Sequence, residues 1–577
     1  MSGRHYHKEL DRLRNLSSAF AEARPALAPM LGGPTTDPDA ERLLEGTAFK
    51  IGLLREKLES DFPEVVNEMT QRLYPHYPRH FPAVTIVAFT VKQPVTESCI
   101  IPAGTFIDSV PLDGTSCTFA TAWDVEVHPL HLADVTVTRT SVRETAVRLS
   151  LALSGLPLAQ WRAERLRLLV TGEYVSAADL FLCLNRHLKR IVITPEEGGT
   201  PLFLPIDCLQ PVGYALEASL LPYPPHAFPG FRLLQEYFSF PEKFLSFELT
   251  GLDRWQDRGE GARFSITFEV DGHALGATSV RRESFALFAV PAVNLFPHEA
   301  DPILLDHRAT GYLVRPSGPK PFHYQIFSVE SVTGLTRSTG RERSYAPFDL
   351  YRPDNRDSAV YHTIPRKSPV HAGFDLHLSP SYPQGSPPPE EETLSLQLTC
   401  SNGTLPEGLH VGDISLLSSG ISDKVAVRNI TPIRPGTFPP PAPDLADRFT
   451  AHLFLACLSL SNADTLRSLL DLYVFSGNRS GASVAANKKR VAGIEEVTAL
   501  PCERWVRGML LSGRDVRVKV RKDHFGGPGD LYLFGCVLER FIAQCADPNT
   551  FTALTLEETL KGGGYQWAPR LGRQPLL

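Results

Sequence analysis

The spacing of hydrophobic residues changes near residue 84, and this change constrains the possible folds more than any other feature of the sequence. Before it, apolar residues recur three or four positions apart, as on one face of a helix. After it, apolar and polar residues alternate, as in strands with one buried face. No internal repeat of the solenoid type accompanies either pattern. We therefore predict a multidomain α+β protein, with an N-terminal helical segment, sandwich-like β-rich central domains and a small C-terminal α+β domain.

The helical spacing in residues 1–82 forms two apolar stripes. Asp37-Pro38 begins the second, because an aspartate caps free N–H groups and a proline suits the first helical position. Near-heptad spacing at a chain terminus is compatible with a helical bundle shared with neighbouring molecules, and a stripe packed against its own domain is the alternative. The candidate partner-binding residues of this bundle are Leu10, Leu13, Phe20, Leu43, Ile51, Leu54 and Leu58.

Alternating runs predict strands throughout the centre of the chain. The 49 prolines exceed the usual share of about 5%, which favours many turns and sheet edges over long helices. A helical insertion is expected at 177–188. The clearest alternating runs lie at 149–153, 166–170, 191–193, 266–270 and 394–398.

Two proline-rich stretches, 379–392 and 434–443, are predicted to be linkers or exposed loops, because such proline density favours extended backbone. A chain of 577 residues suggests about three to five domains. In the C-terminal part, helices are expected at 446–475 and 531–545, with a strand at 516–520. The predicted domains are a helical region at 1–82, β-rich domains at 83–275 and 276–433, and an α+β domain at 434–577.

Composition and charge exclude several classes of protein. The 58 Lys and Arg against 64 Asp and Glu give a net charge of −6, which argues against bulk capture of nucleic acid or of an anionic membrane. The nine cysteines form no C-x-x-C pair, so reduced thiols are expected rather than a disulfide framework. The N-terminus lacks the apolar core of a secretory signal, and no run of about 18 apolar residues occurs. We therefore expect a cytoplasmic protein with no direct membrane span.

The usual motifs of catalysis and metal binding are absent. There is no phosphate-binding loop, no dinucleotide fingerprint and no nucleophile elbow. The nearest approach to a zinc-binding helix, His298-Glu299, has Pro302 at the second ligand position, and His128 with His131 lacks a third ligand. We predict no catalytic residue, no cofactor and no metal. A multidomain cytoplasmic hydrolase stays open as an alternative, because sequence separation hides the geometry of a general acid and base.

One local concentration of charge is basic. Residues 485–522 carry ten Lys or Arg against four acids, and Arg517, Lys519 and Arg521 share one face of the predicted strand. One interpretation is a docking face for an acidic partner. The other is a solvated face that protects an edge strand from unwanted pairing. Nucleic acid is disfavoured, because few aromatic residues stand between the charges to stack on bases.

Several motifs, in order along the chain, resemble one known family. They are 37–49 (DPDAERLLEGTAF), 228–244 (FPGFRLLQEYFSFPEKF), 293–296 (VNLF) with Asp301-Pro302, 534–541 (FGCVLERF), 549–551 (NTF) and 569–573 (PRLGR). On these residues the chain is similar to the TssF family, also called ImpG or VasA, of baseplate subunits of the bacterial type VI secretion system. Residues 101–105 (IPAGT), followed by 119–121 (FAT), resemble a pattern of contractile phage wedge proteins. The family's Thr-Asn-Arg is Ser401-Asn402-Gly403 here, and its Cys-Thr is Ala289-Val290.

The resemblance implies a structural role rather than an enzymatic one. It implies a wedge protein of which two copies pair around one TssG, and which binds TssK and TssE. It further implies that the wedges assemble around the VgrG spike hub, docked on the inner face of the bacterial inner membrane, as the platform for tube and contractile sheath. A wedge protein of another contractile injection particle, such as a phage tail, is the alternative.

Overall fold

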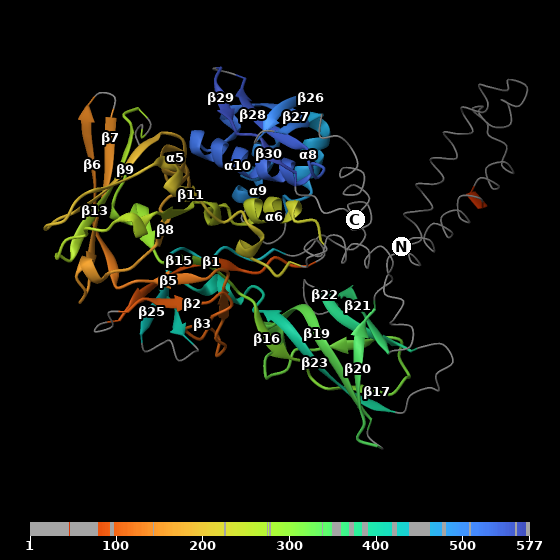
Figure 1. Ribbon diagram of the computed structural model, residues 1–577. Coiled ribbons are helices and arrows are strands. Elements are labelled where there is room, and N and C mark those ends of the chain that lie inside the picture. Colours follow the sequence, from red (N-terminus) through yellow and green to blue (C-terminus); the bar gives the residue numbers. More distant parts are fainter. Residues whose placement is uncertain are drawn as a thin grey trace, which may run out of the picture. The chain divides into compact units, whose positions relative to one another are not determined.

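The computed structural model describes residues 45–46 and most of residues 79–572 (Figure 1). Of the predicted N-terminal helical region, only residues 45–46 and 79–82 are described, and all seven stripe residues lie outside the described residues. The chain divides into two compact units, 1–72 with 442–449 and 73–441 with 450–577, and every strand and helix named below belongs to the second. The segments not described between 79 and 572 are 93–96, 142–143, 224–226, 274, 276–278, 337–338, 349–358, 369–373, 383–390, 418–423, 438–461, 476–480, 507–508 and 560–561.

A six-stranded antiparallel sheet has the strand order β24-β3-β4-β15-β1-β25. Strand β1 reads VTIVAFTV, and this nearly continuous apolar run fits its place between two neighbouring strands with most of its side chains buried. The sheet takes strands from both predicted β-rich ranges, and the predicted boundaries themselves stay a prediction. Its strands are β1 (Val84–Val91), β3 (Phe106–Ser109), β4 (Thr118–Thr121), β15 (Ala289–Val293), β24 (Ile414–Leu417) and β25 (Val425–Asn429).

A five-stranded sheet, ordered β10-β9-β13-β7-β6, and a four-stranded sheet, ordered β11-β12-β8-β14, follow along the chain. The alternating runs at 149–153, 166–170, 191–193 and 266–270 lie in β7, β8, β9 and β13, so these predictions are confirmed. The strands are β6 (Leu130–Ser141), β7 (Glu144–Leu153), β8 (Arg165–Val170), β9 (Leu188–Pro195), β10 (Leu202–Leu204), β11 (Leu209–Pro211), β12 (Ser246–Thr250), β13 (Arg263–Asp271) and β14 (Phe285–Leu287). A separate two-stranded pair joins β2 (Cys99–Ile101) to β5 (Val125–Val127).

Helix α5 (Tyr174–Arg186) confirms the helical insertion expected between these strands. Its N-terminus is set by Glu173, whose carboxylate accepts hydrogen bonds from the N–H groups of Val175 and Ser176. These bonds satisfy two of the free N–H groups that every helix leaves at its start. They also lower the pKa of Glu173, because they favour its ionised form.

The second β-rich range forms a closed eight-stranded barrel rather than a sandwich. The sheet is ordered β16-β23-β19-β20-β21-β22-β18, and β17 also pairs with β23. Its two ends meet where the N–H of Ser317 donates to the carbonyl of Glu299 at 2.9 Å and that of Asp301 to Arg315 at 2.8 Å. The interior is filled by side chains that include Leu378, Leu394, Leu396 and Leu398. The strand predicted at 394–398 is confirmed, because these residues lie in β23.

The bounds of the barrel strands are β16 (Phe296–Glu299), β17 (Ile303–Leu305), β18 (Tyr312–Val314), β19 (Gln325–Thr336), β20 (Glu342–Pro347), β21 (Val360–Lys367), β22 (Phe374–Ser381) and β23 (Glu392–Ser401). Strand β23 is the most connected of them, because β16, β17 and β19 all pair with it. The alternation of its buried and exposed residues places one face in the barrel interior.

The C-terminal part is α+β, as predicted. Its sheet contains β26 (Ile494–Val506), β27 (Met509–Val520), β28 (Phe551–Glu558), β29 (Gly564–Gln566) and β30 (Arg570–Leu571). Its described helices are α8 (Ala463–Asp471), α9 (Gly481–Ala492) and α10 (Pro528–Gln544). Helix α10 confirms the helix expected at 531–545, and α8 occupies only part of the helix expected at 446–475, whose earlier residues lie outside the described chain.

Helix α10 holds the C-terminal sheet against the central sheets. It is buried along almost its whole length and packs against α5 and against α6 (Gly230–Ser239). The approach to α5 requires a glycine, because a Cβ at Gly529 would lie 2.2 Å from the backbone carbonyl carbon of Ala178. A side chain on Gly535 would likewise meet the ring of Trp567.

Candidate assembly surfaces and the buried ion cluster

The motif at 228–244 forms α6 and the short 3-10 helix that follows it, Pro241–Phe244. All ten residues of α6 are buried, including its polar residues. A helix that is covered on all sides normally carries apolar residues all round. The motif therefore places charged side chains where burial alone would be costly, and they need partners.

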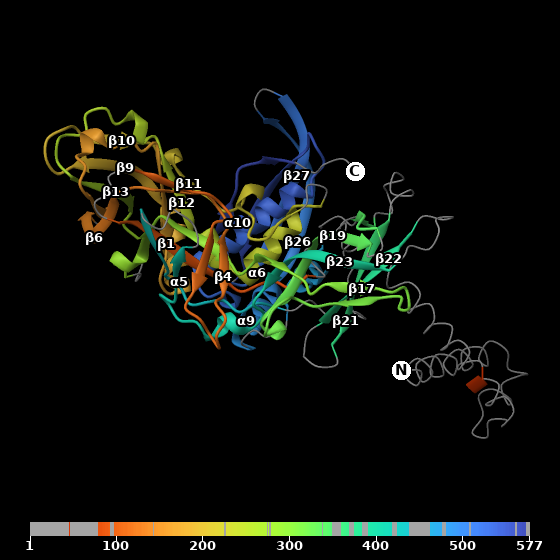
Figure 2. The same cartoon turned by 90° about the horizontal axis from the view of Figure 1, so that it is seen from below.

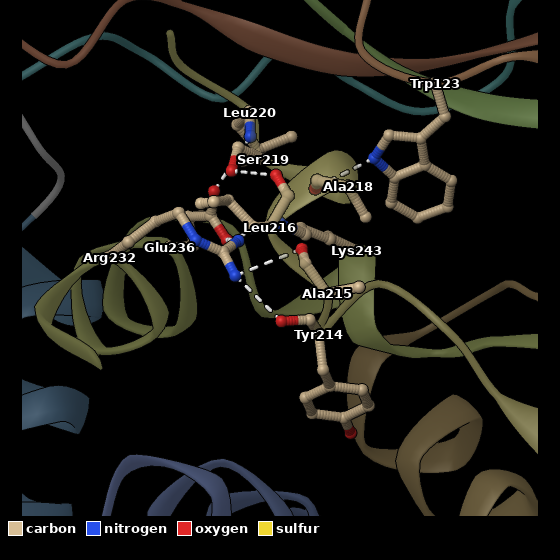
Figure 3. A network of polar contacts seen from close by, with 10 residues as sticks. All are labelled: Trp123, Tyr214, Ala215, Leu216, Ala218, Ser219, Leu220, Arg232, Glu236 and Lys243. Atoms are coloured by element: carbon tan, nitrogen blue, oxygen red, sulfur yellow. Dashed lines mark hydrogen bonds and ion pairs between the residues drawn. The ribbon is translucent and has the colours of Figure 1, made fainter. Parts of the chain in front are cut away.

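Three of these charges meet in an ion cluster formed by Arg232, Glu236 and Lys243 (Figure 3). Their exposed fractions are 2%, 1% and 0%. The Arg232 guanidinium donates to Oε2 of Glu236 at 2.8 Å, and the Lys243 ammonium donates to the same oxygen. The other carboxylate oxygen, Oε1, accepts the backbone N–H of Leu220 at 2.8 Å. Every oxygen of the carboxylate is therefore engaged.

The cluster also binds the backbone of residues 214–220, a loop that packs over α6. A second nitrogen of Arg232 donates to the carbonyls of Tyr214 at 2.7 Å and Ala215 at 3.1 Å. The indole N–H of Trp123, which follows β4, donates to the carbonyl of Ala218 at 2.9 Å (Figure 3). From α10, the guanidinium of Arg540 lies 3.7 Å from the ring centre of Tyr214. Through these contacts the 214–220 loop connects α6 to Trp123, which follows β4, and to Arg540 of α10.

The electrostatics of the cluster are unbalanced, because two cations share one carboxylate. Burial lowers the pKa of Lys243 to about 7, and the Arg232 charge lowers it too, while Glu236 raises it. A buried carboxylate with two cationic donors is fixed in place and serves as a structural clamp. Sequence reasoning marked this motif only by its resemblance; the available signal was two charges at i and i+4 within an aromatic run.

A second buried junction joins the six-stranded sheet to the barrel. Asn294, from the VNLF motif, donates to Asn402 Oδ1 at 2.8 Å and to the carbonyl of Thr118 at 2.8 Å. The backbone N–H of Asn402 donates in return to Asn294 Oδ1 at 2.6 Å. Neither side chain is more than 1% exposed. The sequence Ser401-Asn402-Gly403 departs from the family pattern on both sides of this asparagine but keeps the residue that forms the junction.

The IPAGT segment forms a tight turn between β2 and β3. Gly104 has a φ of +78°, a conformation that favours glycine. The N–H of Gly104 donates to the carbonyl of Thr121, and the N–H of Thr121 donates to the carbonyl of Thr105. The pattern with FAT therefore reflects the pairing of the turn with the end of β4.

The predicted basic face is only partly as expected. Strand β27 is not an edge strand, because β26 pairs with it antiparallel and β28 parallel; the edge-protection interpretation is therefore wrong. Arg517 is exposed on this strand. Lys519 pairs with Glu496 across the sheet at 2.7 Å, and Arg521, just beyond the strand, pairs with Asp523 at 2.8 Å. Two of the three cations thus have carboxylates beside them.

The described residues also bear on metal binding and on the membrane. They include no group of three or more His, Cys, Asp or Glu side chains placed to hold a metal ion. His128 is buried and packs edge-on against Trp161, whereas His131 is exposed, so the pair is not brought to one site. Among the described helices, none has the length and hydropathy to cross a bilayer.

Comparisons with known proteins point to one family over nearly the whole length of the chain. Residues 2–574 match the family model described as "Type VI secretion system, TssF". The type VI secretion system component TssF1 of Pseudomonas aeruginosa is 28% identical over 629 aligned positions, which cover 99% of both chains.

Solved structures point the same way. A chain of the TssK-TssF-TssG baseplate subcomplex, determined by cryo-electron microscopy, is 30% identical and superposes with a TM-score of 0.76 over 93% of this chain and 99% of its own length. A chain of a type VI secretion system baseplate complex is 26% identical, with a TM-score of 0.62 over the full length of both. The ordered motifs, the multi-sheet fold and these full-length matches have one explanation: the chain belongs to the TssF family and is a structural component of the type VI secretion baseplate, not an enzyme.

Proposed function

We propose that this chain works as a baseplate wedge component that assembles with TssG and TssK. The observation that carries the proposal is the correspondence, over 93% of this chain, with a chain of a TssK-TssF-TssG subcomplex. The buried clamps support it. A scaffold has to keep its surfaces in fixed relation while partners bind, and the Arg232–Glu236–Lys243 cluster and the Asn294–Asn402 junction supply that rigidity.

We extend the proposal to the rest of the assembly. Two copies of the chain pair around one TssG, and the wedge also contacts TssE and the VgrG hub as the platform for sheath and tube. The baseplate docks on the inner face of the bacterial inner membrane. The support for these points is the family resemblance of the ordered motifs, together with a fold that matches a chain of a baseplate complex along its full length.

The proposed partner-binding elements are the N-terminal stripes and the basic face. Stripe residues such as Leu13 and Leu54 bind neighbouring helices in a shared bundle, because apolar stripes at near-heptad spacing pack knobs into holes. The face with Arg517, Lys519 and Arg521 docks an acidic partner surface. The proposed domain boundaries are those of the sequence analysis. The loop predicted at 379–392 is too long, because residues 379–381 belong to β22 and Glu392 begins β23. The residues between these strands and the stretch 434–443 are the proposed connecting loops.

The first test replaces one stripe residue at a time. Leu13→Asp or Leu54→Asp puts a charge in the apolar seam, which costs several kcal/mol wherever the seam is covered. We expect each variant to fold when expressed alone but to lose TssG and TssK on co-expression, as measured by size-exclusion chromatography. Arg12→Asp, on the same predicted helix but outside the stripe, is the matched control and should keep both partners.

Two outcomes would contradict the proposal. If the Leu13→Asp variant unfolds on its own while the control does not, the stripe belongs to the chain's internal core. If the unmodified chain elutes alone in the presence of co-expressed TssG and TssK, the assembly itself is excluded.

A further inference from the structure

The barrel is one continuous stretch of chain inserted into the six-stranded sheet. Its eight described strands lie between Phe296 and Ser401, whereas β15 of the six-stranded sheet precedes them and β24 and β25 follow. Figure 2 shows the labelled barrel strands β17, β19, β21, β22 and β23 gathered in one group. The chain enters the barrel at residues 294–295 and leaves it at 402–403, and we call these four residues the neck.

Both passages of the chain bend at the neck. The N–H of Leu295 donates to the carbonyl of Val293 at 2.8 Å, so Asn294 is the middle of a three-residue turn. Gly403 has a φ of +56°, a left-handed conformation that favours glycine. The two hydrogen bonds between Asn294 and Asn402 hold the passages side by side. Short bends at the ends of strands are places where a hinge absorbs changes in φ and ψ.

Side chains beyond the neck also join the barrel to the rest of the chain, and the first two precede β1. Nε2 of His80 lies 2.7 Å from Oγ of Ser401, at the end of β23. The His80 ring packs edge-on against Phe327 of β19, and the guanidinium of Arg79 lies 5.2 Å from the centre of the same ring. His80 and Phe327 are both buried, so these contacts are shielded from water.

The other contacts come from β3 and from the turn between β3 and β4. Oγ1 of Thr115 lies 2.8 Å from Nδ1 of His323, which is buried just before β19 begins. The ammonium of Lys320 donates to the carbonyl of Asp113. Phe106, at the start of β3, packs against the barrel core and adds an apolar contact.

We call the side-chain contacts of Arg79, His80, Thr115 and Lys320 the lock. They are individual hydrogen bonds and ring contacts rather than a broad apolar surface. Each hydrogen bond adds little by itself, because it replaces one made to water. Two domains of one chain move relative to each other unless their interface is large and apolar. The lock therefore selects one orientation of a barrel that the neck alone would leave free to turn.

We propose that the barrel is a pivoting module, with the neck as its pivot and the lock as the device that holds its orientation. While the lock is closed, the barrel keeps a fixed relation to the six-stranded sheet. When the lock opens, the barrel turns as one piece, because its sheet is closed on itself. Arg79 and His80 lie between the N-terminal region and β1 in the sequence, so displacement of this segment opens the lock. The proposal concerns the conformation of the chain itself and so goes beyond the proposed baseplate role.

Distances between spin labels test the pivot. The labels are attached to p-acetylphenylalanine in place of Glu342 in β20 and Arg428 in β25, two exposed positions, so that the native cysteines stay in place. We expect one narrow distance distribution in the otherwise wild-type chain. Ser401→Ala combined with Thr115→Val removes two hydroxyls of the lock. It should broaden the distribution at least twofold, because the barrel then samples other orientations.

Matched substitutions within the barrel are the control. Ser379→Ala combined with Thr336→Val also removes one serine and one threonine hydroxyl, but their partners, the carbonyl of Thr310 and the carboxylate of Glu392, belong to the barrel. This variant should keep the wild-type distribution. Lys320→Met, at a half-buried position, removes a third lock contact and should broaden the distribution less than the double variant. It decides the question if the double variant does not fold.

A second label pair, at Leu304 and Glu342, lies within the barrel and should give a narrow distribution in every variant. The proposal is overturned by a broad 342–428 distribution in the wild type, by an unchanged one in the lock variants, or by equal broadening in the control. Broadening of the 304–342 pair in the lock variants would also overturn it, since the lock would then belong to the barrel's own core. None of these measurements uses TssG or TssK, so this proposal and the proposed function fail separately.

Discussion

Single residues show how much this scaffold depends on charges placed in its interior. Arg232 and Glu236 stand four positions apart, a spacing that on most helices gives an exposed ion pair. Here the carboxylate also binds Lys243, and none of the three is exposed above 2%. Local sequence rules predict that such residues lie on the surface. They form a buried ion cluster here because α10 and the 214–220 loop cover α6.

Removing the carboxylate should cost more than removing the lysine. Glu236→Gln leaves two buried cations without a counter-charge and is expected to reduce the free energy of unfolding by about 3–5 kcal/mol. Lys243→Met leaves the Arg232–Glu236 pair intact and removes a charge whose burial is unfavourable, so its loss should be smaller. Urea unfolding of both variants measures this. An equal or larger loss for Lys243→Met would show that the lysine, not the carboxylate, organises the cluster.

His128 makes the stability of the fold depend on pH. Burial lowers its pKa from 6.5 to about 4. Between these values the unfolded chain binds a proton that the folded chain does not, so this contribution is complete above pH 6.5 and is lost as the pH falls towards 4. The loss should reach about 3 kcal/mol, at about 1.4 kcal/mol per unit of pKa difference.

The matched measurement compares the wild type with His128→Gln, which does not titrate. Unfolding by urea at pH 7 and pH 4 should show a larger loss for the wild type, and the fluorescence of Trp161, in contact with His128, reports the region directly. Parallel losses in the two proteins would assign the acid sensitivity to other groups, including the buried His80, whose pKa burial also lowers.

At the scale of elements, β27 shows why a stripe of cations is not by itself a binding surface. The alternation of apolar and basic residues in β27 could be predicted from the sequence, because a period of two residues is a local property. The position of β27 between β26 and β28 could not be predicted, because its parallel partner β28 lies beyond the intervening helix α10. The carboxylate of Glu496 opposite Lys519 followed only once the strands were paired.

Charge reversal on this strand should separate the contribution of the exposed Arg517 from that of the half-buried Lys519. If the face docks an acidic partner, Arg517→Glu is expected to weaken binding of TssG and TssK more than Lys519→Glu does, because Lys519 is already paired with Glu496. The difference should shrink as salt is raised, since exposed charges are screened. Binding measured at several salt concentrations checks it. Affinities that do not change for either variant would leave the face a solvated surface.

For the whole molecule, the sequence predicted strand positions, one helical insertion and the C-terminal helix, and the family motifs led to the assembly. It did not predict which strands pair. Strand β1 lies beside β25, and Phe89 faces Val427 across a separation that no local pattern records. The long hairpin of β26 and β27 was missed because β26 carries Pro501 and an irregular alternation. The Asn294–Asn402 junction was missed because a buried amide pair has no periodic signal.

The closure of the barrel has a consequence for a particle that gathers many identical subunits. Concentrated β-rich proteins tend to recruit one another through unsatisfied backbone, and the result is amorphous or fibrous growth. Where residues 299–301 meet 315–317, the described chain uses up those groups internally. The barrel can therefore lie close to identical barrels in a crowded assembly without aggregating through backbone pairing. Its contacts with neighbouring subunits are then determined by side chains.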